Sequence, residues 1–88
     1  MYLHLGQDVL VLLDEVVGIF DIENSSLAKS TRNYLAEAEK NKKVINVSSE
    51  MPKSFIVCEI NGRETVYVSQ ISSQTLKKRA GFIDGISL

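Results

Sequence analysis

The hydrophobic pattern at the start of the chain predicts strands. Residues 2–5 alternate apolar and polar positions and stop at a glycine, which predicts a short strand. Residues 9–13 form a continuous apolar run that is typical of a buried strand, and residues 16–22 predict a third strand. Since only Asp14-Glu15 separates these two runs, we expect them to pair as antiparallel neighbours. Gly18 marks a bend or a close approach of backbone.

Helical spacing dominates the next segment. The apolar positions fall at i, i+4, i+7, i+8 and i+11 and would share one helix face; they are Leu27, Thr31, Tyr34, Leu35 and Ala38. Good N-cap residues precede them, namely Asn24, Ser25 and Ser26. Lysines follow at the end, where cations complement the last carbonyls. A helix from about Ser26 to Asn41 is expected, followed by a short strand at Val44 to Val47.

Two apolar, β-branched runs flank Asn61-Gly62 and predict a hairpin. A two-residue turn would place Ile60 opposite Arg63 and Ser54 opposite Ser69. It would also oppose Glu59 and Glu64, which a three-residue loop would avoid, so both registers stay open. In the first register both faces are apolar, one with Phe55, Val57, Val66 and Val68, the other with Ile56, Cys58, Ile60 and Tyr67. One face would meet the helix and the other a further surface, so we predict the second set as an oligomer interface.

The end of the chain predicts a short helix and an apolar tail. Ser72 or Ser73 can cap a helix from Gln74 to Arg79 that Gly81 ends. The fold class is therefore α+β, a small, mostly antiparallel sheet on one main helix, in the order β-β-β-α-β-β-β-α. We expect one domain over residues 1–80 and a tail over residues 81–88 that folds back or docks on a neighbour.

Composition narrows the protein class. The chain has 88 residues, 44% of them hydrophobic and 24% charged, which is ordinary for a globular domain. The N-terminal segment carries Asp8, Asp14 and Glu15 and lacks a basic start, so we expect neither a signal peptide nor a membrane span. A single cysteine, Cys58, points to a reducing compartment, and the cytoplasm is the expected location.

Catalytic chemistry is not expected from this sequence. His4 is the only histidine, lies in a predicted strand and adjoins no nucleophile motif. No loop has the ligand spacing of a metal site, and no phosphate-binding glycine motif occurs. We therefore predict no enzyme activity, no metal, no cofactor and no small-molecule substrate.

Charge is distributed unevenly, which favours nucleic acid or a second subunit as the partner. Residues 1–24 carry five acidic residues and no Lys or Arg, whereas residues 25–54 carry six basic and three acidic residues. Basic residues at element ends and in loops suit contacts with phosphates, although helix ends and solvent favour cations in any protein. The candidate DNA-binding residues are Lys42, Lys43, Lys53, Lys77, Lys78 and Arg79.

Four motifs in order give a family resemblance: LHLG at residues 3–6, IFD at 19–21, PKSF at 52–55 and ISSQTLKKRA at 71–80. Together they resemble the RemA/RemB family of bacterial regulators of extracellular-matrix (biofilm) genes, and the chain looks closer to the RemB branch. The resemblance implies a DNA-binding transcriptional regulator that assembles into ring-like homo-oligomers on double-stranded DNA. It also implies DNA contacts in the loop at residues 50–53 and near the start of the third strand. Here these positions hold Glu50-Met51-Pro52-Lys53 and Asp14-Glu15, so only Lys53 keeps a positive charge.

Two hypotheses follow. In the first, the protein is an oligomeric DNA-binding regulator of matrix genes whose contacts are directed to phosphates. In the second, an oligomer of the same fold is an adaptor that acts through protein partners without direct DNA binding. The acidic N-terminal third and the doubly apolar hairpin favour the second.

Overall fold

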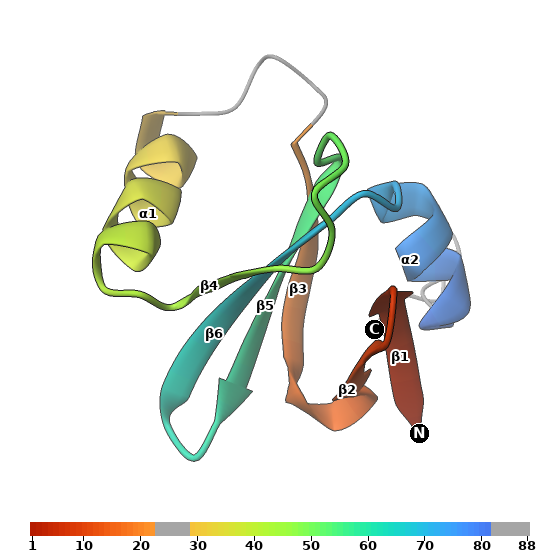
Figure 1. Cartoon of the computed structure of the whole chain (residues 1–88). Coiled ribbons are helices and arrows are strands. Elements are labelled where there is room, and N and C mark those ends of the chain that lie inside the picture. Colours follow the sequence, from red (N-terminus) through yellow and green to blue (C-terminus); the bar gives the residue numbers. More distant parts are fainter. Residues whose placement is uncertain (23–28, 82–88) are drawn as a thin grey trace.

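A computed structural model describes residues 1–22 and 29–81. Strands and helices follow in the predicted order, with a short 3₁₀ turn (η1) after the second strand (Figure 1). Their bounds are β1 (Tyr2–Gly6), β2 (Val9–Leu12), η1 (Leu13–Glu15), β3 (Val16–Asp21), α1 (Lys29–Lys40), β4 (Val44–Asn46), β5 (Ser54–Ile60), β6 (Arg63–Ser69) and α2 (Ser73–Arg79). The predicted α+β class is confirmed.

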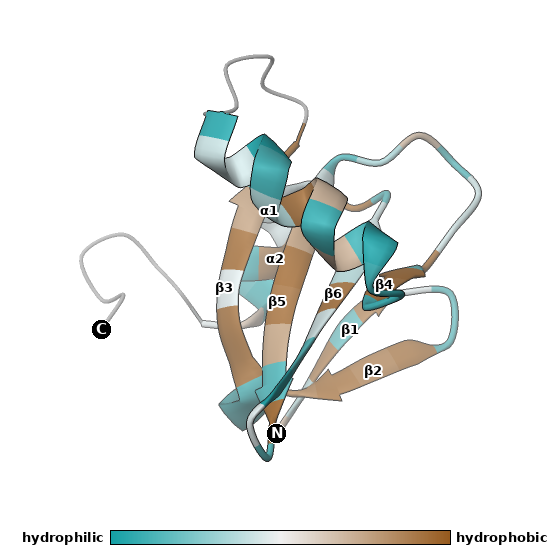
Figure 2. Cartoon of the chain, turned by 90° about the vertical axis from the view of Figure 1, so that its left-hand side faces the viewer, coloured by the Kyte–Doolittle hydropathy of each residue, from teal (hydrophilic) through white to brown (hydrophobic). Residues whose placement is uncertain are grey.

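The strands form two sheets. Four strands make the larger sheet in the order β3-β5-β6-β4, and β1 and β2 form a separate antiparallel pair. Helix α1 covers one face of the larger sheet, while β1, β2 and α2 lie against the other face (Figures 1 and 2). The fold therefore has three layers with the four-stranded sheet in the middle. No helix among the described residues has the length and apolarity to span a membrane.

The expected pairing of the second and third strands is wrong. β2 pairs with β1, and β3 pairs antiparallel with β5, because η1 redirects the chain from one sheet to the other. The expected burial of the run 9–13 is also wrong, since Leu10 and Leu12 are exposed and only Val11 is buried. A two-stranded sheet that packs on one face leaves its other face to solvent, so these residues alternate in burial.

The central hairpin has the two-residue turn, which resolves the open register. Ser54 lies opposite Ser69, Ile60 lies opposite Arg63, and β5 and β6 are antiparallel throughout. Asn61 and Gly62 take φ values of 52° and 80°, the positive angles that a type I′ turn requires.

The like-charge pair of Glu59 and Glu64 forms as this register implies. Both residues are exposed, where water screens their repulsion. In addition, the Tyr34 hydroxyl of α1 donates a hydrogen bond of 2.9 Å to Glu64. The pair is therefore tolerated at the solvent end of the hairpin.

Each face of the central hairpin is buried within the chain. The face toward α1 packs in a core cluster of Ala38, Phe55, Val57 and Val66. The opposite face belongs to a larger cluster of Leu3, Leu5, Val11, Ile19, Val47, Ile56, Cys58, Leu76 and Ala80. The second apolar face therefore meets β1, β2 and α2 of its own chain, and its burial needs no second subunit.

Helix α1 ends at the lysine-rich segment, as predicted. One of these lysines has an unusual backbone conformation. The Lys43 N–H donates to Ala38 O over 2.8 Å and the Lys42 N–H donates to Glu39 O over 3.0 Å, the two bonds of a Schellman motif. Lys42 has a φ of 58°, in the left-handed region where glycine usually closes such a motif. The predicted N-cap residues of this helix lie outside the described residues.

Strand β3 bends next to Gly18, as the sequence predicted. Its register with β5 shifts between Val16 and Gly18, which leaves Val17 as the bulged residue. A Cβ at Gly18 would stand 2.6 Å from the Phe20 ring, so the ring covers this position closely. The predicted bend occurs, and what lies close to Gly18 is the Phe20 side chain rather than a second stretch of backbone.

The structure confirms the predicted C-terminal helix, α2, and its N-cap at Ser72. The Ser72 hydroxyl accepts a hydrogen bond from the Thr75 N–H over 3.2 Å, and α2 ends at Arg79. Gly81 follows with a φ of 83° and donates its N–H to Lys78 O over 3.1 Å. The predicted tail beyond Gly81 lies outside the described residues.

Candidate nucleic-acid interface

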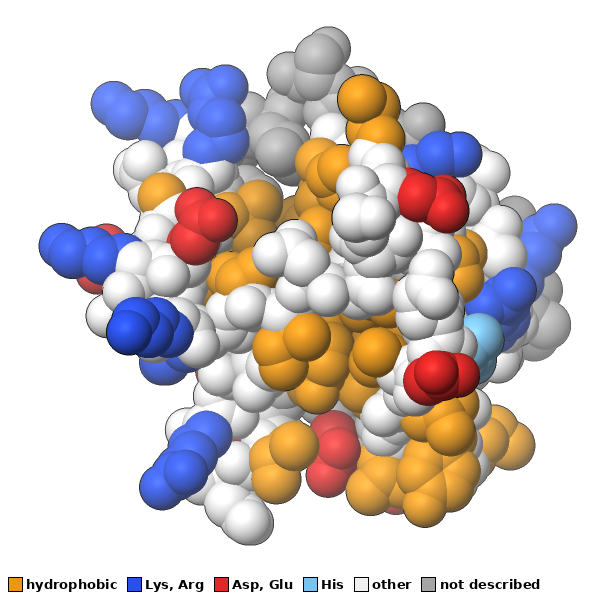
Figure 3. Space-filling model, viewed as in Figure 1, with side chains coloured by type: hydrophobic (Ala, Val, Ile, Leu, Met, Phe, Trp, Pro, Cys, Tyr) orange, Lys and Arg blue, Asp and Glu red, His pale blue; other side chains and the backbone are white. Residues whose placement is uncertain are grey.

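The six predicted DNA-binding residues fall into two separate groups. Lys42 and Lys43 lie where α1 turns into β4, the strand at one edge of the sheet, whereas Lys53 directly precedes the inner strand β5, and Lys77, Lys78 and Arg79 end α2 on the face opposite α1. On the face shown in Figure 3, basic side chains occupy the two lateral margins, while hydrophobic ones gather at the centre and over β1 and β2. The folded chain therefore has no single continuous basic face in this view.

Lys53 stands beside the segment that leads into α2. Its N–H donates to Ser69 O and its carbonyl accepts from the Ile22 N–H, each over 2.9 Å. The next residue, Ser54, is fully buried and its hydroxyl donates to Ile71 O over 2.7 Å. These bonds fix the backbone of Lys53 on the sheet while its side chain remains exposed.

Helix α2 carries three exposed cations, and one buried residue packs the helix against the core. Leu76 is fully buried in the core cluster against β1, and Lys77, Lys78 and Arg79 are exposed. The Arg79 guanidinium donates to His4 O over 3.3 Å, which ties the end of the helix to β1. The packing of Leu76 therefore holds the three neighbouring cations at the surface of the chain.

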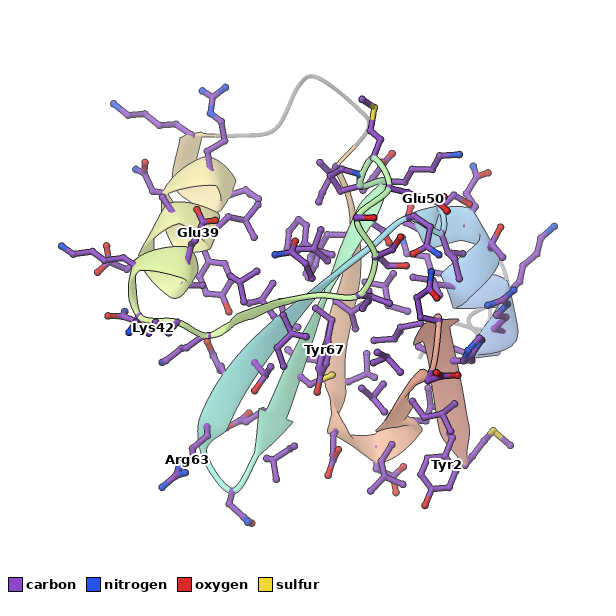
Figure 4. The ribbon with its side chains drawn as sticks, viewed as in Figure 1. Tyr2, Glu39, Lys42, Glu50, Arg63 and Tyr67 are labelled. Carbon is purple, nitrogen blue, oxygen red and sulfur yellow. The ribbon has the colours of Figure 1, made fainter. Side chains whose placement is uncertain are left out.

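A second basic group joins Lys42 and Lys43 to Arg63, a basic residue at an element end that lies outside the six candidates. Arg63 follows the hairpin turn and lines the same surface hollow as Lys42 and Lys43, with a volume of about 440 Å³. The Val66 N–H donates to Lys43 O over 2.8 Å, which aligns β4 with β6. Figure 4 shows Lys42 and Arg63 on the same side of the molecule. The Asn61-Gly62 turn was the sequence signal that fixed where Arg63 lies, but only the β4–β6 pairing brings it to the lysines.

The predicted interface residues differ in their accessibility. Ile56 and Cys58 have exposed fractions of 0% and 1% within the single chain, so they leave no accessible surface for a second subunit. Ile60 is exposed and Tyr67 is half-buried. The layer of β1, β2 and α2 covers this face, so the prediction that it requires a neighbouring subunit is wrong for Ile56 and Cys58. A contact through Ile60 and Tyr67 remains a prediction.

The side chains of Cys58 and His4 are candidates for chemistry, and the surroundings of each indicate a structural role. Burial raises the pKa of the Cys58 thiol to about 11, and the charge of Glu15 adds to the shift, which keeps the thiol protonated near neutral pH. His4 Nε2 lies 2.6 Å from Gln7 O, across the turn of its own hairpin. In the part of the chain that the structure describes, no group of three or more His, Cys, Asp or Glu is arranged to hold a metal ion.

Acidic residues stand at the start of β3, where the family resemblance implied a DNA contact. Asp14 is exposed and Glu15 is half-buried at the end of η1, directly before Val16. Carboxylates repel phosphates, so this position cannot serve as a phosphate site in this chain. Any DNA contact must come from the basic groups on other elements.

These observations define a small α+β domain with exposed basic groups on a helix and at sheet ends, and the chain belongs to the RemA-like family. That family, described as extracellular matrix regulatory protein A-like, matches residues 2–80. Extracellular matrix regulatory protein B of Bacillus subtilis (strain 168) is 40% identical over 83 residues, which cover 94% of each chain. The earlier resemblance to this family, closer to its B branch, is confirmed.

Proposed function

We propose that this protein regulates extracellular-matrix genes as an oligomeric, DNA-binding protein in the bacterial cytoplasm. Its family and its relative are both described as extracellular matrix regulatory proteins. The observation that supports the DNA contact is the cluster of exposed cations that the buried Leu76 anchors on α2, with Lys53 exposed beside the segment that leads into this helix; the four cations are Lys53, Lys77, Lys78 and Arg79. A regulator that binds DNA works where the chromosome is, which is the reason for the cytoplasm.

Phosphate contacts of this kind give affinity with little sequence discrimination. Each neutralised phosphate releases counterions, so log K falls with log salt by about 0.9 per contact. Four contacts in one subunit would give a slope of about −3.6, and single-subunit affinity would be low. Several subunits on one duplex would add their contacts through effective concentration. The proposal therefore joins DNA binding to assembly.

Replacement of the α2 cations tests the DNA contact. We expect the triple variant Lys77→Gln, Lys78→Gln and Arg79→Gln to lose at least about tenfold in duplex affinity at low salt, measured by mobility shift. Lys53→Gln should weaken binding by less, because it removes one contact. A matched triple variant on α1, at Lys29, Arg32 and Lys40, removes the same charge from other exposed positions. Equal losses in both triple variants, or no wild-type binding at low salt, would overturn the proposal.

The second candidate function is that of an adaptor that acts through protein partners. Asp14 and Glu15, directly before β3, favour it, together with exposed apolar residues at the N-terminus and on β1 and β2: Met1, Tyr2, Leu10 and Leu12. A face of this kind marks an interaction surface more often than a nucleic-acid site. A stable assembly with no DNA affinity at low salt would support the adaptor over the regulator.

A further inference from the structure

The four-stranded sheet has two open edges. β3 and β4 are its outermost strands, and no segment among residues 1–22 and 29–81 pairs with their outer sides. Edge strands present unpaired N–H and C=O groups to a further strand, and proteins usually block them with lysine or proline. Neither strand contains either residue, and the bulge at Val17 protects only the start of β3. Residues 18–20 and 44–46 remain able to pair.

The two edges match in direction. β3 is antiparallel to β5, β5 is antiparallel to β6, and β4 is parallel to β6, so β3 and β4 run the same way. A second copy placed beside the first in the same orientation would thus present its β3 to β4 as a parallel partner. Such a contact joins two different surfaces, and repetition of it builds rings or filaments.

The register across the sheet brings opposite charges to the same level. One row of paired residues runs through Gly18, Val57, Val66 and Val44, so Val44 is level with Gly18. The residues before Val44 are Lys42 and Lys43, and the residues before the β3 bulge are Asp14 and Glu15. One step earlier in each strand, Lys43 is level with Val16, so in a continued sheet Lys42 and Lys43 of one copy would lie near the end of η1 of the next copy, which carries Asp14 and Glu15.

Exposed apolar side chains lie on both edge strands, β3 and β4. Val17 and Phe20 on β3 are 62% and 43% exposed, and Ile45 on β4 is 45% exposed. A hollow of about 340 Å³ lies between β3 and α1, with Val17, Phe20 and Tyr34 in its wall. A second hollow of about 340 Å³ lies between β4 and α1, with Leu35 and Val44 in its wall. Joining the edges would bring the two hollows together and remove their apolar walls from water.

We propose that β3 of one copy pairs in parallel with β4 of a second copy, with Asp14 and Glu15 facing Lys42 and Lys43. This inference rests on the assembly that the proposed function requires, and it names the surface that forms it. It assigns Lys42 and Lys43 to the contact between subunits, and it leaves Lys53 and the α2 cations for DNA. It also explains why acids occupy the start of β3 in a protein proposed to bind DNA.

A charge exchange between the two edges tests the proposal. Variant A carries Asp14→Lys and Glu15→Lys, and variant B carries Lys42→Glu and Lys43→Glu. Each variant alone opposes like charges at the contact, so its dissociation constant should rise at least about tenfold in sedimentation velocity at low salt. In an equimolar mixture every A–B contact has opposite charges again, so the mixture should recover the wild-type assembly.

The outcomes separate this inference from the proposed function. Circular dichroism first establishes that A and B are folded. Wild-type assembly by A alone or by B alone, a mixture of folded variants that stays dissociated, or a monomeric wild type would each overturn the edge pairing. The control Lys77→Glu and Lys78→Glu should assemble like wild type and lose DNA binding. Assembly restored in the mixture without wild-type DNA affinity would overturn the DNA proposal alone.

Discussion

A methyl group at Gly18 provides a direct test of how β3 packs. A Cβ there would lie 2.6 Å from Cζ and 2.7 Å from Cε2 of Phe20. The backbone at Gly18 is not in the positive-φ region, so Gly18→Ala introduces a steric contact without conformational strain. The Phe20 ring also stacks on Phe55, with ring centroids 4.9 Å apart and an interplanar angle of 19°. The substitution therefore displaces a ring that is already held by another.

The structure sets the expected size of this effect. Phe20 is 43% exposed, so its ring can swing outward more easily than the paired strand can move. Loss of the stack costs about 0.5–1.5 kcal/mol, and loss of the remaining burial costs about 1–1.5 kcal/mol. Alanine regains about 0.5–1 kcal/mol over glycine in a strand. We expect Gly18→Ala to lower the free energy of unfolding by about 1–2 kcal/mol.

A double-mutant cycle in urea, at fixed protein concentration, checks this reasoning. Phe20→Leu removes the ring, so Gly18→Ala in that background should be neutral or stabilising by up to about 1 kcal/mol. The coupling between the two substitutions should then be about 1–3 kcal/mol. The same cost for Gly18→Ala in both backgrounds would refute the ring contact as its cause.

Three further predictions concern α2, the end of α1 and the Tyr34 hydrogen bond. Leu76 is fully buried, so Leu76→Ala should cost about 2–5 kcal/mol in urea unfolding, against less than about 0.5 for Lys77→Ala. Lys42 has a φ of 58°, so Lys42→Gly should stabilise the chain by about 0.5–1 kcal/mol, and a loss would contradict that backbone. Burial, with the hydrogen bond to Glu64, raises the pKa of Tyr34 from 10 to about 12. Its contribution to stability is therefore complete below pH 10 and is lost as pH rises toward 12. Tyr34→Phe should make that part of the pH profile less steep, since the raised pKa of Cys58 still contributes to it, and an unchanged profile would contradict the assignment.

Local signals predicted the central hairpin and the last helix well. Asn61-Gly62 predicted the hairpin, and the structure selects the two-residue turn from the two registers that the sequence left open. Ser72, one of the two predicted cap residues, caps the N-terminus of α2. These features depend on residues that are near in sequence, so the sequence pattern contains them.

Long-range pairing was harder to predict. The short link at Asp14-Glu15 was read as a tight turn between paired strands, yet it connects two different sheets. An apolar pattern shows that the Ile56 face is buried, but not which distant element buries it. The site has the same limit: exposed lysines were evident, whereas their separation into two groups depends on the β4–β6 pairing and on the packing of α2.

The salt dependence of duplex DNA binding tests the central claim most directly. Fluorescence anisotropy of a labelled duplex, titrated between about 50 and 200 mM salt, gives the slope of log K against log salt for wild type and for the triple α2 variant. We predict a steep negative wild-type slope that becomes shallower by about 2.7 for each bound subunit in the variant, since three phosphate contacts are lost. A wild-type slope near zero, or an unchanged slope in the variant, would contradict phosphate binding by α2.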